Sequence, residues 1–317
     1  MKNNVKKLRA VAALAAFVVA ALPALLAGCA GGEAGDGKLK VAADIAPLAD
    51  FCRQVGGDLV VVETMVPPGA SPHTYELTSG QMRFLSEADV LVTNGLGLTP
   101  WAEEVLGKTD NPGLVAVVAG EAVPQEDLIP VVAAAGGEDG HEEHGAYNPH
   151  VWLDPHLARH LVEAVRDGLV RADPGDAAVY RANAEEYLAE LASLDRAIAA
   201  EVASFESRKF VSFHSSWTYF ARRYGLEQAG VIEELPGKEP SAGEIAELVE
   251  VVRGMGVRVI FAEPQFSPRT AETIAEESGG EVVVRVLDPL GDPGNPETDT
   301  YLEMMGHDLE VMGEVLR

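Results

Sequence analysis

Cysteine, aromatic and basic residues are all scarce in this chain of 317 residues. It contains 2 cysteines, 6% aromatic residues and 24 basic residues against 50 acidic ones, which gives a formal net charge of −26. Two cysteines are too few for a disulfide-stapled scaffold. The deficit of basic residues excludes nucleic acid as a partner, because a phosphate backbone requires a positively charged face. With 47% hydrophobic residues, the chain suits one large or two medium globular domains.

The amino-terminal region has the pattern of a secretory lipoprotein signal. Basic side chains precede an almost wholly apolar stretch at 10–27, which ends in Gly28 and Cys29. This pattern predicts a signal peptide at 1–28, lipidation of Cys29 and a flexible Gly-rich tether at 29–37. A signal anchor that stays in the membrane is the alternative. We expect an extracytoplasmic protein held by acyl chains on the periplasmic or cell-surface face of the membrane.

Apolar β-type runs alternate with helical patterns along the rest of the chain, as in β-α-β units that build a parallel sheet. A first set of four runs lies at 38–44, 58–66, 89–94 and 114–118, and a second set lies at 209–213, 226–231, 257–262 and 281–287. Between the two sets, a segment with apolar residues at helical spacing runs to about Phe205 without an internal Pro or Gly. A helix of about 30 residues spans about 45 Å, which is long enough to join two lobes.

These patterns predict an α/β fold with two parallel-sheet lobes joined by a single long rigid helix. The expected boundaries are an amino-terminal lobe at 38–172, a linker helix at 173–205 and a carboxyl-terminal lobe at 206–317. We expect limited hinge motion, because a continuous helix is stiffer than a Gly/Ser linker.

Three histidines and one aspartate occupy positions from which side chains could reach a common ligand. His73 lies in a Pro-rich loop after an apolar run, His214 and Asp288 each directly follow one, and His150 precedes a helix that Asp154 is expected to cap. Open α/β sheets gather ligands at the carboxyl ends of their strands. Singly, each residue is equally well explained by a surface or turn role. Together they would supply the four ligands that a tetrahedral zinc site prefers. Imidazole ligands suit zinc, copper, nickel or iron, whereas manganese or magnesium would require more oxygen donors.

Two further histidines, His141 and His144, lie in a tract of glycine and acidic residues at 136–145. This composition indicates a mobile loop that helps to capture metal, and an ordinary solvated acidic loop is the alternative. The tract does not match the zinc-protease motif, whose histidines lie four apart on one helix face. The second cysteine, Cys52, is expected to be a buried structural thiol.

Five motifs give the chain a resemblance to the cluster A-I metal-binding lipoproteins of ABC importers. They are PHTYE at 72–76, NPHVWLDP at 148–155, FH at 213–214 followed by YFARRYGL at 219–226, FAEPQF at 261–266 and LDPLG at 287–291. Within that family the chain is most similar to the ZnuA/TroA-like zinc-uptake substrate-binding proteins. The resemblance implies two α/β lobes joined by one rigid helix, with the metal held in the cleft between the lobes.

The same resemblance implies a function. Such a protein is a monomer that captures a divalent metal and delivers it to an ABC permease and its ATPase subunit, and it is not an enzyme. His73, His150 and His214 would bind the metal, with Asp288 or a water in the fourth position. Manganese-type members usually have a carboxylate where His214 stands, so Zn2+ is the expected cargo and Mn2+ or iron the alternative.

Glu263, which follows an apolar run of the second set, enters two different interpretations. In the transport interpretation it is a candidate to hold the second nitrogen of a ligating imidazole, although a surface role fits its position equally well. In a secreted zinc hydrolase it would be the general base beside a metal-bound water, but ligands spread over two lobes suit a closing clamp better. A surface adhesin is compatible with the same fold.

Overall fold

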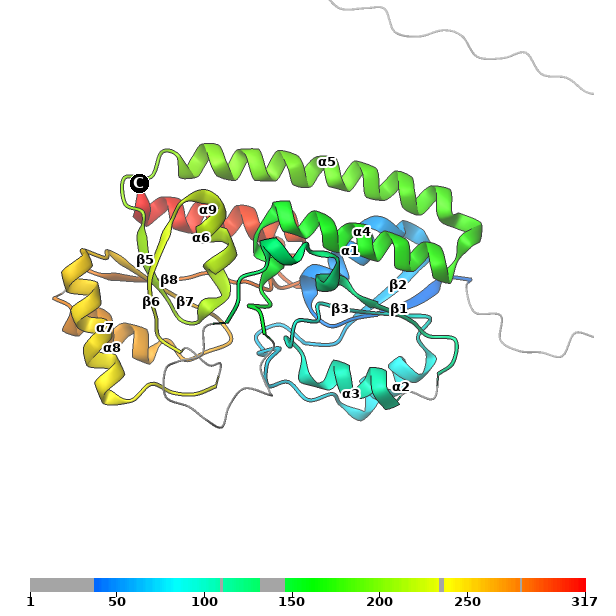
Figure 1. The fold of residues 1–317 in the computed structure, drawn as a ribbon, viewed down its shortest axis with the longest axis horizontal. Helices are drawn as coiled ribbons and strands as arrows, with labels where there is room; N and C mark the ends of the chain where they lie inside the picture. The colour runs from blue at the N-terminus through cyan, green and yellow to red at the C-terminus, as the bar shows by residue number, and fades with distance from the viewer. Residues whose placement is uncertain (1–36, 109–110, 132–145, 234–236, 280) are drawn as a thin grey trace, which may run out of the picture. The chain divides into compact units, whose positions relative to one another are not determined.

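The computed structural model describes residues 37–108, 111–131, 146–233, 237–279 and 281–317, and within them eight strands form two sheets (Figure 1). The first sheet has the order β2-β1-β3-β4, with β1 (Leu39–Ala43), β2 (Val60–Thr64), β3 (Val90–Thr93) and β4 (Val115–Val118). The second has the order β6-β5-β7-β8, with β5 (Lys209–Ser212), β6 (Glu227–Val231), β7 (Val259–Ala262) and β8 (Val283–Val286). All neighbouring strands in both sheets are parallel.

This architecture confirms the predicted α/β fold with two parallel sheets. Each apolar run that predicts a strand contains one of the observed strands, which is shorter by at most two residues at either end. The agreement is close because runs of Val, Ile and Phe bounded by polar residues favour a buried strand over a helix.

Helices cover both faces of each sheet (Figure 1). The face common to the two sheets is covered by α1 (Ala46–Gly56), α4 (Pro155–Ala172), α5 (Ala177–Val202), α6 (Thr218–Tyr224) and α9 (Tyr301–Leu316). The opposite face of the first sheet is covered by α2 (Ser79–Glu87) and α3 (Pro100–Lys108), and that of the second by α7 (Ala242–Met255) and α8 (Arg269–Glu277).

Strand residues alternate between an inner core that the two sheets share and outer cores that they do not. Val41 of β1 and Phe261 of β7 belong to one continuous apolar core beneath both sheets. Ala42 instead packs toward α2 and α3, and Ile260 packs toward α7 and α8. This alternation follows from the two-residue period of a strand. Because the sheets share their inner core, a large rotation of one against the other would expose buried apolar surface.

Helix α5 corresponds to the linker helix expected at 173–205. It is 26 residues long and begins after a separate 3₁₀ turn, Pro174–Asp176. It packs against α1, α4 and α9. Helix α9, the last of the chain, also contacts α1, the first. Asp50 of α1 joins them, because its Oδ2 accepts hydrogen bonds from Tyr187 Oη of α5 at 3.2 Å and Tyr301 N of α9 at 3.0 Å.

Helix α4 begins where the sequence predicts. Asp154 caps it by accepting a hydrogen bond from His156 N at 2.9 Å, and Pro155 occupies the first helical position. Near its other end, Gly168 allows a close approach to β4, since a Cβ there would lie 2.3 Å from a methyl group of Val117. The helix is thus fixed to the first sheet, and it holds the segment that precedes it.

Several sequence predictions concern residues outside the described ranges. They are the signal peptide at 1–28, Cys29 and most of the tether, and the tract with His141 and His144. Among the described helices, none has the length and apolar character needed to cross a membrane. Cys52 is described, and it is a buried free thiol whose pKa is raised by burial, as expected of a structural cysteine.

Candidate metal centre

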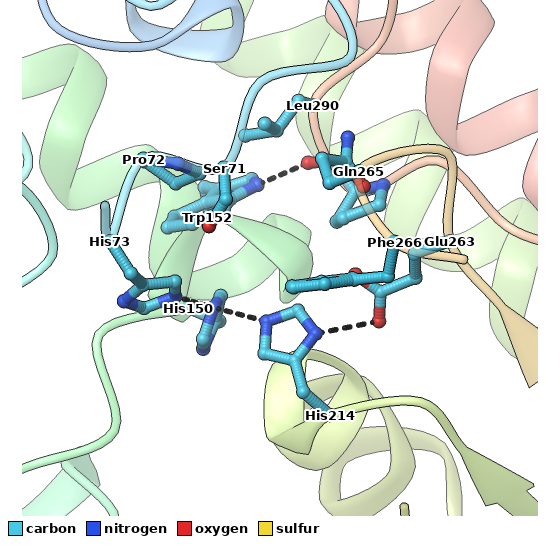
Figure 2. A pocket seen from close by; sticks show the side chains of 11 residues that line it. Ser71, Pro72, His73, His150, Trp152, His214, Glu263, Gln265, Phe266 and Leu290 are labelled. Carbon is cyan, nitrogen blue, oxygen red and sulfur yellow. Dashed lines mark hydrogen bonds and ion pairs between the residues drawn. The ribbon is translucent and has the colours of Figure 1, made fainter. Parts of the chain in front are cut away.

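Three histidines from three separate segments meet in a pocket lined by residues of both lobes (Figure 2). His73 comes from the loop after β2, His150 from the segment before α4, and His214 from the end of β5. The Nε2 atom of His150 lies 3.3 Å from that of His73 and 3.1 Å from that of His214. Among the described residues, this is the one group of three or more His, Cys, Asp or Glu side chains close enough to share an ion.

The distances between these nitrogens are those of ligands to a common ion. A tetrahedral zinc ion with Zn–N bonds of about 2.0–2.1 Å holds its nitrogen ligands about 3.3–3.4 Å apart. Two unprotonated nitrogens that face each other at this separation repel unless a proton or a cation lies between them. The arrangement therefore fits a cation shared by the three nitrogens.

Two of the imidazoles are oriented through their other nitrogen. His150 Nδ1 lies 2.8 Å from Asn148 Oδ1. His214 Nδ1 lies 2.9 Å from Glu263 Oε1, although the ring N–H is not aligned well enough with this oxygen for a hydrogen bond. Both oxygen-bearing side chains are buried. An acceptor beside Nδ1 keeps the proton on that nitrogen and leaves the lone pair of Nε2 for a metal.

The protonation state of His150 suits a ligand. Burial, followed by the neighbouring His214 and His73, lowers its pKa well below the usual 6.5. A ligating imidazole must be unprotonated. His150 is therefore neutral at physiological pH without having to release a proton first.

Glu263 is held in place from the second sheet. It follows β7 directly, is 2% exposed, and accepts a hydrogen bond on Oε1 from Ser216 Oγ at 2.9 Å. Its Oε2 is buried and has no hydrogen-bond partner among the residues that the structure describes. This placement puts one carboxylate against the imidazole of His214, on the side away from the other two histidines (Figure 2).

Aromatic side chains form the walls of the pocket. The ring of Trp152 lies 5.2 Å from that of His150, and its Nε1 donates a hydrogen bond to Pro289 O at 2.7 Å. Phe266 lies 5.4 Å from the ring of His214 in an edge-on arrangement. The cavity that remains has a volume of about 10 Å³, which is the space of one water-sized sphere. This space can accommodate a single ion.

Asp288 lies beside this pocket, and its carboxylate is not part of the histidine cluster. It follows β8 as expected, and its neighbours in the chain, Pro289 and Leu290, line the pocket. Its Oδ1 accepts hydrogen bonds from Gln265 Nε2 and Leu290 N, both at 3.1 Å. Its backbone N donates to Asp308 Oδ1 of α9 at 3.0 Å. The carboxylate is thus turned toward Gln265.

Sequence reasoning assigned no role to several residues that shape the site. They are Asn148, Trp152, Ser216 and Phe266. Each lies in or near a motif that contains a candidate ligand or Glu263, and this was the only signal in the sequence. Which atoms they would contact depends on how distant segments meet, and no local pattern contains that information.

The fold and the site define a two-lobed α/β protein with a cluster of three histidines between its lobes that could hold a metal ion. The chain belongs to the family described as zinc-uptake complex component A, periplasmic (ZnuA), whose model matches residues 41–315. The resemblance inferred from the five motifs is thereby confirmed.

Individual relatives extend over nearly the whole chain. The manganese-binding lipoprotein MntA of Halalkalibacterium halodurans is 30% identical over 302 residues, which cover 93% of this chain and 95% of that protein. The zinc-binding lipoprotein AdcA of Streptococcus pneumoniae is 31% identical over 303 residues, covering 93% of this chain and 60% of AdcA. A crystal structure of ZnuA superposes with a TM-score of 0.74 at 31% identity, covering 88% of this chain and all of that chain.

Proposed function

We propose that this protein captures a zinc ion outside the cytoplasm and delivers it to the permease of an ABC importer, whose ATPase subunit supplies the energy. The observation that carries the proposal is the convergence of three Nε2 atoms, two from the first lobe and one from the second. Membership of the ZnuA family and the metal-binding relatives support it.

Delivery requires that the ion can leave, and the origin of the ligands suggests how it does so. His73 and His150 belong to the first lobe and His214 to the second. A small separation of the lobes would withdraw one of three nitrogen ligands and weaken the hold on the ion. We infer that docking on the permease supplies this separation, since the shared inner core resists it in the isolated protein.

The donor set favours zinc over manganese as the cargo. All three clustered ligand atoms are imidazole nitrogens, which suit zinc, whereas manganese prefers more oxygen ligands. Glu263 contacts an imidazole rather than the point where the three Nε2 atoms meet, so it adds no oxygen to the ligand set.

Asp288 is our proposal for the fourth ligand, with a water as the alternative. Its carboxylate would have to turn away from Gln265, which now donates to Oδ1 at 3.1 Å. Asp288→Asn tests this assignment. A carboxylate ligand predicts weaker zinc binding by the variant, and an unchanged affinity would assign the position to water.

Capture explains the pocket better than hydrolysis does. A cavity of about 10 Å³ cannot hold a peptide or ester beside a metal-bound water. The general base of a hydrolase would have to reach that water, but the Oε1 of Glu263 is engaged by Ser216 and lies against His214 Nδ1. We therefore assign Glu263 to orienting His214.

Outside the described residues, the proposal includes a lipid anchor and an auxiliary metal-capturing loop. Lipidation of Cys29 would tether a monomer to the membrane beside its permease. Cys29→Ala should release the protein from the membrane fraction. Replacing both His141 and His144 with Ala should slow zinc uptake by cells when zinc is scarce and leave the affinity of the main site unchanged.

The central experiment is metal analysis combined with competition titration on the chain without residues 1–29. We expect one tightly bound zinc per chain and zinc to outcompete manganese. His214→Ala should lower the zinc affinity by more than the roughly 100-fold that loss of an outer partner costs. His160→Ala, on the exterior of α4, is the matched control and should bind like the wild type. Tighter binding of manganese would overturn the metal assignment, and an unaffected His214→Ala would overturn the site.

A further inference from the structure

Asn148 contacts both sides of the metal site through the two ends of its side-chain amide. Its Oδ1 accepts hydrogen bonds from His150 N at 3.0 Å and from His150 Nδ1 at 2.8 Å. Its Nδ2 donates to the carbonyl oxygen of Ser215 at 2.7 Å. Ser215 directly follows His214, so one 5%-exposed side chain joins a ligand of the first lobe to the residue next to a ligand of the second.

The orientation of this amide follows from its neighbours. A backbone N–H can only donate and a backbone carbonyl can only accept. The oxygen of Asn148 must therefore face His150 N, and its nitrogen must face Ser215 O. Because the oxygen also lies against His150 Nδ1, that nitrogen must carry the proton. The Nε2 of His150, which faces His73 and His214, then has a free lone pair.

The backbone around Asn148 is fixed by elements of both lobes. Its N donates to Ile129 O at 2.8 Å, and its O accepts from Tyr219 Oη of α6 at 2.8 Å. The next residue is held too, since Asn94 Nδ2 donates to Pro149 O at 2.9 Å. The backbone of Asn148 is thus anchored independently of the metal site that its side chain contacts.

We propose that Asn148 is a positioning residue for zinc capture: it fixes His150 in the tautomer that binds metal, and it ties this ligand to His214 across the cleft. The inference rests on the proposed function and assigns it a further residue. Loss of the residue should act through the ligands and should leave the fold intact.

The test measures tautomer and affinity separately, on the full chain with ¹⁵N-labelled histidine. In the zinc-free wild type, imidazole ¹⁵N NMR should show His150 protonated on Nδ1 alone. Asn148→Ala should give a mixture of both tautomers and a zinc affinity lower by about 10- to 100-fold. Asn183→Ala is the matched control: it removes the same kind of side chain from α5, where its Nδ2 donates to Val55 O at 3.0 Å, and it should keep the wild-type tautomer and affinity.

Asn148→Asp separates the two halves of the proposal and keeps it testable if the Ala variant fails to fold. The carboxylate still accepts from His150, so the tautomer should stay pure. It has no proton for Ser215 O, so zinc should dissociate about fivefold faster, as expected for one lost hydrogen bond. The added negative charge alone would slow dissociation, and a slower rate would therefore overturn the tie across the cleft.

The remaining outcomes distinguish this inference from the proposed function. A pure Nδ1–H tautomer in Asn148→Ala would overturn the positioning role even if affinity fell, and a mixed tautomer with unchanged affinity would overturn its relevance to capture. If the wild type bound no zinc, the proposed function would fail, while the tautomer in the zinc-free protein would still decide what Asn148 does to His150.

Discussion

The two sheets have the same strand order, but the polar residues that follow their central strands have opposite uses. In the first lobe, β1 and β3 are followed by Asp44 and Asn94, and Asp44 Oδ2 accepts a hydrogen bond from Asn94 N at 2.8 Å. In the second lobe, the corresponding strands β5 and β7 are followed by His214 and Glu263, whose side chains lie 2.9 Å apart. The first pair makes hydrogen bonds to the protein's own backbone, whereas the second leaves the Nε2 of His214 available for a metal.

This difference shows that a position at the end of a strand permits a side chain to bind a ligand but does not ensure that it does. Asp44 is completely buried, and its Oδ1 and Oδ2 accept further hydrogen bonds from Ile45 N at 2.8 Å and Thr99 Oγ1 at 3.2 Å. With its central strand ends occupied in this way, the first lobe supplies its ligands from longer segments. The Asp44–Asn94 pair still contributes to the site, because Asn94 Nδ2 donates a hydrogen bond to the carbonyl oxygen of Pro149, directly before His150.

The largest expected effect is a contrast between two topologically matched positions. Asp44→Ala leaves three buried donors without an acceptor and should lower the free energy of unfolding by about 4 kcal/mol. His214→Ala should change it by less than about 1 kcal/mol while abolishing tight zinc binding. Denaturant unfolding of the zinc-free variants measures both. Equal destabilisation by the two substitutions would remove the distinction between the lobes.

The next effect concerns pH, because burial raises the pKa of Asp44 to about 6. The folded state then holds this proton more tightly than the unfolded state, so the stabilisation is full below about pH 4 and is lost as pH rises to 6. Relative to Asp44→Asn, the wild type should lose about 3 kcal/mol of unfolding free energy across this window. Unfolding curves of both proteins from pH 4 to 7 test this, and parallel profiles would contradict it.

Weakening the corresponding pair in the second lobe should affect metal binding instead. Glu263→Gln replaces the carboxylate against His214 Nδ1 by a neutral amide and should lower zinc affinity about tenfold. Competition titration measures the affinity, and thermal unfolding of the zinc-free protein should show little change. A loss of stability without a loss of affinity would assign Glu263 to the core rather than to the site.

The smallest effect tests how far the first-lobe pair is isolated from the metal. Thr99→Val removes one hydrogen bond to Asp44 and should lower the unfolding free energy by about 1 kcal/mol. Zinc affinity should stay at the wild-type value, because Asn94 still fixes Pro149. Any measurable change in affinity would show that this pair is coupled to the metal site.

The strands were predictable because their signals are local. Runs such as 257–262, rich in β-branched and aromatic residues and bounded by Gly256 and Glu263, define a buried strand without reference to the rest of the chain. The clustering of the three histidines was predictable for a related reason: chain position relative to a strand or helix end limits where a side chain can lie. Those patterns, together with the motif resemblance, were enough to predict the two sheets and the cluster.

The contacts that orient the ligands could not be predicted, because they depend on where distant segments meet. Nothing near Asn148 shows that its amide faces Ser215, 67 residues further along. Asp288, like His214, lies just after the end of a strand, but its carboxylate faces Gln265. The linker segment expected from residue 173 contains the separate turn Pro174–Asp176 before the long helix begins at Ala177.

The contact between α9 and α1 also determines when the chain can finish folding. The hydrogen bond from Tyr301 N to Asp50 joins residues 251 positions apart, and α9 supplies part of the inner core. Contacts between such distant segments form late, since the loop between them must close first. Until α9 is present, Asp50 lacks the hydrogen bond from Tyr301 N, and the apolar surfaces of α1 and α5 that α9 covers stay exposed. If the chain crosses a membrane starting from its amino terminus, its inner core can therefore be completed only after α9 has crossed.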